Sequence, residues 1–237
     1  MSFPITMSPI GIINSPFKEK FGIPRQPGIV KSAIFEIDFF DPYTQDEAFR
    51  GLEGFSHVWI LFIFDRIKRN EWKATVRPPR EGGNKRLGVF ATRSPYRPNP
   101  IGISAVKNEG WKLSEGKKIL LVSGGDFLHE TPVIDIKPYI PYTDSIQNAV
   151  GGFAPDSPQA NMEIFFSKEA EEKCGRITWN GNGLFRDFLV EILSQDPRPA
   201  YHSSKNTKKD YALRVCGFNI LWEAENGFIQ VKDIIRE

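Results

Sequence analysis

The stretch Val58-Trp59-Ile60-Leu61-Phe62-Ile63-Phe64 is the longest apolar run of the chain. Seven residues suit a β-strand and fall far short of the ~20 that a membrane span requires. Other short apolar or alternating runs lie at residues 10–13, 30–37, 87–90, 102–106 and 119–122, separated by Pro, Gly and Asn. Most of the 18 prolines precede residue 142, which argues against long helices there. The pattern predicts a mainly β region, either a small barrel or a sandwich.

The sequence pattern changes after residue 148, from mainly β to mixed α and β. Residues 149–165 read as a linker, and residues 166–237 as a small C-terminal α+β domain. Within it we expect helices at 167–173 and 183–194 and strands at 214–222 and 227–231, with Asn226-Gly227 as the turn of a hairpin.

Length and composition exclude several classes of protein. A chain of 237 residues can bury a core that needs no disulfide or metal to hold it together. Its two cysteines, Cys174 and Cys216, have no metal-binding spacing, so we expect no metal and a reducing, cytoplasmic setting. The N-terminus lacks the pattern of a signal peptide, and no membrane association is expected.

Basic residues are concentrated in one window. Between residues 77 and 97 stand six basic residues and a single acid, Glu81, although the net charge of the whole chain is only +2. Such a run can simply be a solvated face. Five of the six are arginines, the side chain suited to bidentate contacts with phosphate or carboxylate. The window therefore also suggests an anionic partner.

Three proline-containing segments contain charged and polar side chains that turn formation does not require. They are residues 15–28, 91–102 and 126–144, read here as loops. Turn geometry asks for Gly, Asn and Pro; it does not ask for Arg93 or Lys137. Rigid polar loops on a β scaffold are typical of a functional site.

At these residues the sequence resembles the TrmO (TsaA-like) family of tRNA methyltransferases. The resemblance extends from Ile10 to about Tyr211 and is carried by seven strings in order: Pro24-Arg25-Gln26-Pro27-Gly28, residues 55–62, Arg77-Pro78-Pro79-Arg80, residues 88–94, Arg97-Pro98-Asn99-Pro100-Ile101-Gly102, residues 131–139 and residues 196–201. It implies a small single-sheet β-barrel with Pro-rich loops over residues 5–148, followed by the C-terminal α+β appendage. It also implies a homodimer that transfers a methyl group from S-adenosylmethionine to N6 of threonylcarbamoyladenosine at position 37 of threonine tRNA.

The resemblance also implies the cofactor-binding residues. They are Pro24, Arg25, Gln26, Asp65, Arg66, Arg93, Ile103, His129, Glu130, Thr131 and Pro132. Asp65 stands where relatives commonly carry His, and His129-Glu130 where they carry Asp-Gly. The chain has no Gly-x-Gly-x-x-Gly fingerprint, since Gly82-Gly83 and Gly124-Gly125 are isolated pairs. Composition and spacing alone would not have indicated a methyl donor.

The catalytic base stays open among Asp65, Asp126, Asp135 and Tyr139. Asp135 shares a strand face with Lys137, so it can equally be one half of a structural ion pair. Tyr139 can cap a barrel or line a nucleobase pocket. The alternative to an enzyme is a non-catalytic RNA-binding barrel, in which arginines hold phosphates and aromatic rings stack on bases. A hydrolase is unsupported, because Ser94 and Ser104 have no histidine partner in a known order.

Contacts with tRNA are expected from basic and amide side chains. The set is Arg77, Arg80, Arg86, Arg97, Asn99, Arg198, Lys208 and Lys209. Arg97, and then Arg86, is the expected partner of the threonylcarbamoyl carboxylate. Arg198 can instead brace the appendage.

Overall fold

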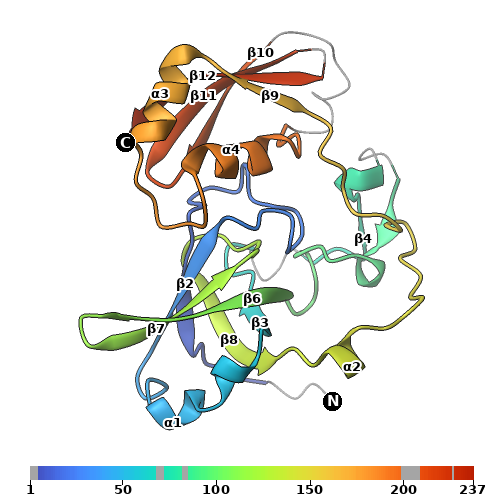
Figure 1. Ribbon diagram of the computed structural model, residues 1–237. Coiled ribbons are helices and arrows are strands. Elements are labelled where there is room, and N and C mark those ends of the chain that lie inside the picture. Colours follow the sequence, from blue (N-terminus) through green and yellow to red (C-terminus); the bar gives the residue numbers. More distant parts are fainter. Residues whose placement is uncertain (1–4, 68–71, 82–84, 199–208, 226) are drawn as a thin grey trace.

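The computed structural model describes residues 5–67, 72–81, 85–198, 209–225 and 227–237 (Figure 1). Its N-terminal part is built on β1 (Gly11–Asn14), β2 (Ile34–Phe39), β3 (His57–Ile63), β6 (Ile101–Ser114), β7 (Lys117–Ser123) and β8 (Thr131–Pro138). These strands pair antiparallel in the order β1-β2-β7-β6-β3-β8, and β1 also pairs with β8, which closes the barrel. The predicted mainly β class is confirmed.

The apolar run of β3 divides between the two faces of the barrel wall. Val58 and Ile60 are fully buried and Phe62 nearly so, inside the barrel. Trp59 and Leu61 alternate with them and point outward, where they are only half-buried. Side chains of a strand alternate between its faces, so this run supplies both the core and an apolar outer surface.

Short elements connect the barrel strands. They are the helices α1 (Asp46–Phe49) and α2 (Pro141–Asp144), the strands β4 (Thr75–Val76) and β5 (Leu87–Gly88), and the 3₁₀ turns Leu52–Gly54, Pro79–Glu81 and Val89–Ala91. β4 and β5 form a two-stranded sheet that carries much of the basic window and lies beside the barrel (Figure 1).

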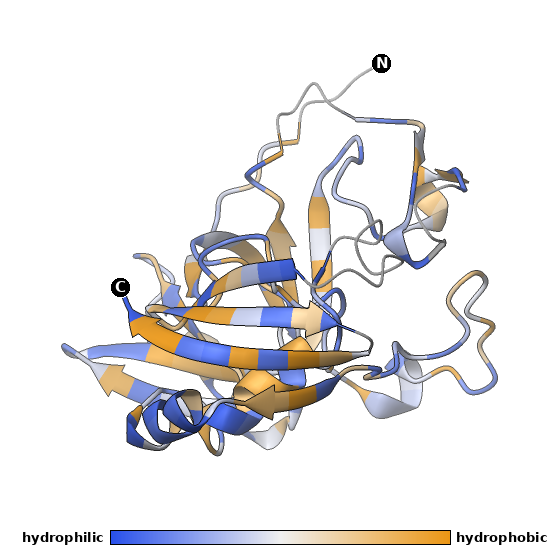
Figure 2. Ribbon diagram, turned by 90° about the horizontal axis from the view of Figure 1, so that it is seen from above, coloured by the Kyte–Doolittle hydropathy of each residue, from blue (hydrophilic) through white to orange (hydrophobic). Residues whose placement is uncertain are grey.

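The C-terminal part is a four-stranded sheet with two helices. Its elements are β9 (Glu163–Phe166), α3 (Lys168–Arg176), α4 (Phe185–Leu193), β10 (Lys209–Val215), β11 (Phe218–Glu225) and β12 (Phe228–Arg236). The strand order is β10-β11-β12-β9, with β9 parallel to β12. Figure 2 shows hydrophobic and hydrophilic residues alternating along these strands, as expected for a sheet with one buried face.

Three predicted boundaries were wrong. The segment 126–144 is not one loop, because β8 occupies Thr131–Pro138. The strand expected at 214–222 is two strands, separated by Cys216 and Gly217, which both have positive φ. The linker expected at 149–165 ends earlier, because β9 begins at Glu163 and pairs with β12.

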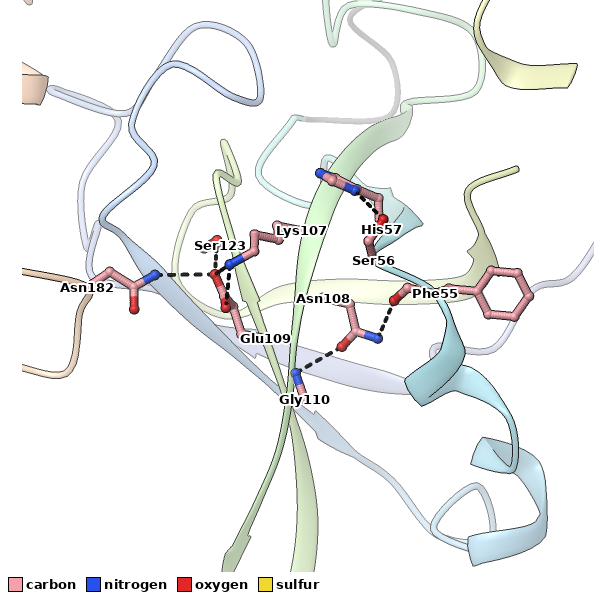
Figure 3. A network of polar contacts seen from close by, with 9 residues as sticks. All are labelled: Phe55, Ser56, His57, Lys107, Asn108, Glu109, Gly110, Ser123 and Asn182. Atoms are coloured by element: carbon pink, nitrogen blue, oxygen red, sulfur yellow. Dashed lines mark hydrogen bonds and ion pairs between the residues drawn. The ribbon is translucent and has the colours of Figure 1, made fainter. Parts of the chain in front are cut away.

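The barrel and the C-terminal sheet share one continuous core. The ring centroid of Phe17 lies 6.1 Å from those of both Phe35 in the barrel and Phe188 in α4. Polar contacts reinforce this junction: Asn182 donates to Glu109 at 3.2 Å, and Glu109 also accepts from Ser123 at 2.6 Å and Lys107 at 2.9 Å (Figure 3). The C-terminal part is therefore docked on the barrel through both apolar and polar contacts.

Candidate functional site

The segment that follows β7 carries the most constrained backbone of the site. Gly124 has a φ of +74°, a conformation that only glycine adopts without strain. At Gly125 a Cβ atom would stand 2.6 Å from the Phe127 ring. Phe127 is buried, with edge-to-face contacts to Phe35 and Phe62. The glycine pair thus turns the chain sharply while Phe127 fixes it to the core, and Asp126 is held between them.

Asp126 meets a buried hydroxyl. Ser104, on the inward face of β6 and 1% exposed, donates to Asp126 Oδ1 at 2.6 Å. Burial raises the pKa of the Asp126 carboxyl to about 6, although the Ser104 hydrogen bond, the backbone N–H of Asp126 and the charge of Arg93 act in the opposite direction. Sequence reasoning missed Ser104 because its partner is 22 residues away and only the barrel brings them together.

The loop of residues 24–28 lies on one side of Asp126. Gly28 N–H donates to Gly124 O at 2.7 Å, which joins this loop to the segment carrying Asp126. Arg93 Nη1 donates to Gln26 Oε1 at 2.7 Å. The structure therefore brings together the predicted residues Pro24, Arg25, Gln26 and Arg93.

A second group of predicted cofactor residues lies at the other end of the same segment. Arg66, just after β3, donates to His129 O at 2.9 Å and lies 3.5 Å from Glu130. Ser15 N–H donates to His129 Nδ1 at 3.3 Å, and burial together with the nearby Lys18 charge lowers the pKa of His129.

The other predicted residues of this group flank these contacts. Glu130 has a φ of +64°. Asp65 is exposed beside Arg66, and Thr131 and Pro132 begin β8. Along the chain, Asp126 thus lies between Gly124, which contacts the first group, and His129, which belongs to the second.

A cleft of about 1680 Å³ opens beside the loop of residues 24–28. Its walls come from that loop, the β4–β5 region, residues 90–96, the segment 151–161 and the end of α4. It is basic, being lined by Arg25, Lys73, Arg77, Arg80, Arg86 and Arg93, with Asp156 and Asp196 as the acidic residues of the lining. Arg80 donates to the carbonyl of Asp156 and so ties two of these walls together. Nothing in the sequence indicates that residues 151–161 form a wall of this cleft, because that stretch reads as a plain linker.

Arg97 does not face this cleft. Its Nη1 donates to Thr92 O at 2.6 Å and to Val89 O and Ser94 O at 3.4 Å, and its guanidinium lies 5.9 Å from the centroid of the Phe90 ring. Arg97 was predicted to meet the substrate carboxylate; in the structure its Nη1 is engaged by the backbone of the loop that presents Arg93. Asn99 is exposed nearby.

Arg198 has the bracing contact that the sequence left open beside RNA binding. It is 7% exposed and forms a bidentate ion pair with Asp196, with Nε 2.6 Å from Oδ1 and Nη2 2.8 Å from Oδ2. The pair lies beyond the end of α4 and braces the C-terminal part. Lys209 is exposed at the start of β10, with Nζ 5.8 Å from the Tyr211 ring centroid. Lys208 lies outside the described residues.

The remaining predicted residues lie away from the cleft. Asp135 on β8 forms an ion pair with Lys137 at 2.9 Å. This is the structural role that the sequence offered as the alternative to a catalytic base. The Tyr139 ring packs 5.5 Å from that of Trp59. Ile103 is 50% exposed and does not belong to the cleft lining.

Two negative findings concern the described residues only. Within them, no three His, Cys, Asp or Glu side chains gather as a metal site requires. None of the helices described is long and apolar enough to cross a bilayer.

Fold and site together define a β-barrel protein with an arginine-lined cleft beside a buried carboxyl. Its N-terminal part, residues 12–145, matches the family model of the tRNA-methyltransferase O N-terminal domain, and residues 159–237 match that of the TrmO C-terminal domain. The chain belongs to the TrmO family.

Individual relatives agree with this. The chain is 46% identical, over 94% of each chain, to a tRNA (adenine(37)-N6)-methyltransferase of Escherichia coli. It is 41% identical to a Pseudomonas aeruginosa protein named as an S-adenosylmethionine-dependent methyltransferase, over 92% of this chain and 91% of that one. A crystal structure of TrmO from P. aeruginosa superposes with a TM-score of 0.79 and 34% identity, covering 100% of this chain and 99% of the other.

Proposed function

We propose that the chain transfers a methyl group from S-adenosylmethionine to N6 of adenine 37 in tRNA. We further propose that the acceptor is threonylcarbamoyladenosine in threonine tRNA and that the reaction takes place in the cytoplasm. The observation that carries the proposal is the junction of the basic cleft with the loop of residues 24–28, Arg93 and Asp126.

The residues around Asp126 fit the charges of this cofactor. S-adenosylmethionine supplies an activated methyl group on a positively charged sulfur and carries both a carboxylate and an ammonium group. Arg93 and Arg66 can donate to the carboxylate. The Gln26 amide, which accepts from Arg93, can orient the ligand.

The cleft suits the backbone of an anticodon arm. Its arginines would hold phosphates in a sequence-independent and salt-sensitive manner. A buried carboxylate needs a cationic partner, and the Arg97 guanidinium is engaged by backbone carbonyls. Arg77 and Arg86, both in the cleft lining, are therefore the proposed partners of the threonylcarbamoyl carboxylate.

The test is single-turnover methylation of threonine tRNA with and without the threonylcarbamoyl group, with binding measured in parallel at two salt concentrations. We expect the unmodified tRNA to bind with moderately reduced affinity and to be methylated hardly at all. Equal methylation of both would contradict the role of the acyl group. Arg77→Ala, which removes a proposed partner of the acyl carboxylate, should reduce methylation and binding of the modified tRNA more than binding of the unmodified tRNA.

The alternative of a non-catalytic RNA-binding barrel makes a different prediction. An enzyme should bind labelled S-adenosylmethionine saturably in the absence of RNA, whereas a binding module should not. Absence of this binding, together with intact tRNA binding, would favour the module.

A homodimer is proposed on a separate observation. The outward side chains of β3 and β6 form an apolar surface of Trp59, Leu61, Ile63, Ile101 and Ile103, which are half-buried or exposed. Apolar patches of this kind mark interaction surfaces, and the residues predicted to bind the cofactor include Ile103 on this surface.

A further inference from the structure

We propose that Asp126 accepts the N6 proton of the acceptor base during methyl transfer, and that Ser104 is the residue that positions Asp126. This inference rests on the proposed function and goes beyond it, because it selects one base from four candidate side chains and adds a residue that had no assigned role.

The first argument is that Asp126 is held in place from three directions. The Gly124–Gly125 turn fixes the backbone before it, and the buried Phe127 fixes the backbone after it. The hydroxyl of Ser104 fixes the carboxyl itself at 2.6 Å. Ser104 engages Oδ1, and Oδ2 is the oxygen that we propose receives the proton. A general base requires this kind of fixed position within reach of its proton.

The second argument is location. Along the chain, Asp126 lies between the contacts to the two groups of residues proposed to hold the cofactor, and its charge interacts with that of Arg93, which lines the basic cleft. The segment that carries it is joined to the loop of residues 24–28, one wall of the cleft, by the hydrogen bond from Gly28 N–H to Gly124 O. Asp135 is paired with Lys137 on β8, and the Tyr139 ring packs near those of Trp59 and His57 at the end of β3. The contacts described for these two residues include no residue of the cleft lining, whereas Asp126 interacts with Arg93.

The chemistry explains why a base is needed. An acylated N6 nitrogen has a delocalised lone pair and is a poor nucleophile until its proton leaves, and acylation also makes that N–H more acidic. In the proposed step the N6–H bond breaks and the proton moves to Asp126 Oδ2. The freed electron pair forms the N6–CH₃ bond as the S–CH₃ bond breaks, and the electrons of that bond stay on sulfur. Asp126 then releases its proton to water.

The acid–base properties of Asp126 match this task. Burial raises its pKa to about 6, and the groups that face it are the Ser104 hydroxyl from β6, the Arg93 guanidinium and its own backbone N–H. A base is most effective when its pKa lies near the working pH. At pH 7 Asp126 is mostly ionised, and it is more basic than an exposed aspartate would be.

The test compares Asp126→Asn and Ser104→Ala with the matched control Ser123→Ala. Ser123 is likewise buried and likewise donates to a carboxylate at 2.6 Å, but its partner is Glu109, at the junction with the C-terminal part. Single-turnover methylation is measured from pH 5 to 9, S-adenosylmethionine binding by equilibrium dialysis, and folding by thermal melting.

We expect the wild-type rate to rise with pH to a plateau, with a midpoint near 6. Asp126→Asn should lower the rate by ~100-fold or more and keep folding and cofactor binding. Ser104→Ala removes a hydrogen bond that favours the ionised form, so its midpoint should move to higher pH. Ser123→Ala should leave the midpoint in place.

Two results would overturn the inference alone: an active Asp126→Asn variant, or a Ser104→Ala profile that is lowered equally at every pH. The Ser104→Ala profile decides the matter if Asp126→Asn fails to fold. A wild-type protein that binds tRNA and cofactor yet transfers no methyl group would overturn the proposed function as well.

Discussion

At the scale of single residues, the ionised carboxylate of Asp126 should lower the free energy of unfolding. Because its folded-state pKa of about 6 exceeds the ordinary value of 3.8, the cost develops between these two pH values and is fully present above them. Asp126→Asn removes the buried charge, so we expect it to raise the free energy of unfolding by about 3 kcal/mol at pH 7. Urea unfolding at pH 7 and pH 4 measures this. The gain should shrink toward pH 4, and a gain of equal size at both pH values would contradict the assignment.

Arg93 and Arg97 should respond differently to truncation. Arg93 is exposed and contacts Gln26, so Arg93→Ala should abolish methylation without lowering the melting temperature. Arg97 donates to three carbonyls of the loop that carries Arg93. Arg97→Ala should therefore lower the melting temperature and also weaken cofactor binding, which thermal melts and dialysis separate. An Arg97→Ala variant with normal stability and cofactor binding would restore it as a candidate substrate contact.

The sequence indicates residue chemistry better than residue partners. The ion pair of Asp135 and Lys137 was foreseeable because the two are neighbours on one strand face. The contacts of Arg97 were not, and those of Arg198 were left open, since an arginine flanked by prolines looks the same in the sequence whether its guanidinium meets phosphate, carboxylate or backbone. Ser104 and Asp126 meet only because β6 and the end of β7 lie side by side in the barrel.

At the scale of elements, the polar junction around Glu109 should stabilise the docking of the C-terminal part. Burial acts to raise the pKa of Glu109, but hydrogen bonds from Ser123, Lys107 and Asn182 and the Lys107 charge outweigh it, and the pKa is lowered. Its stabilising contribution is therefore present above the unfolded pKa, near 4.5, and is lost as pH falls through the folded pKa.

Glu109→Gln should accordingly lower the free energy of unfolding by about 1–3 kcal/mol at pH 7. The difference from wild type should diminish at pH 3.5. Glu115→Gln, in the exposed β6–β7 turn, is the control and should have little effect at either pH. If the two variants behave alike, the junction contributes no measurable stability.

Element prediction succeeded where periodicity was strong and failed where prolines or turns interrupted it. The apolar run of β3 and the helix α4 were found within a few residues. The strand β8 was taken for a loop because it contains Pro132 and ends at Pro138, although proline is tolerated at strand ends. The turn at Cys216-Gly217 was missed because apolar residues flank it on both sides and hide the hairpin.

At the scale of the whole molecule, the outer face of β3 and β6 should decide the oligomeric state. An exposed apolar surface of several large side chains is costly in water, and association of two copies would bury it. Ile103 is 50% exposed at the centre of the surface, paired with Leu61. Ile103→Asp places a charge there, so sedimentation at micromolar concentration should show a monomer, in contrast to a wild-type dimer. If the cofactor pocket lies at this interface, cofactor binding should be lost in parallel.

The control for this experiment is Ile235→Asp. Ile235 is 46% exposed on β12, in the C-terminal sheet, and should tolerate the same charge with no change in sedimentation or cofactor binding. Thermal melting of both variants shows whether the fold survives. A folded Ile103→Asp variant that remains dimeric would show that the subunits associate through another face, and a monomeric wild type with full activity would remove the need for an interface altogether.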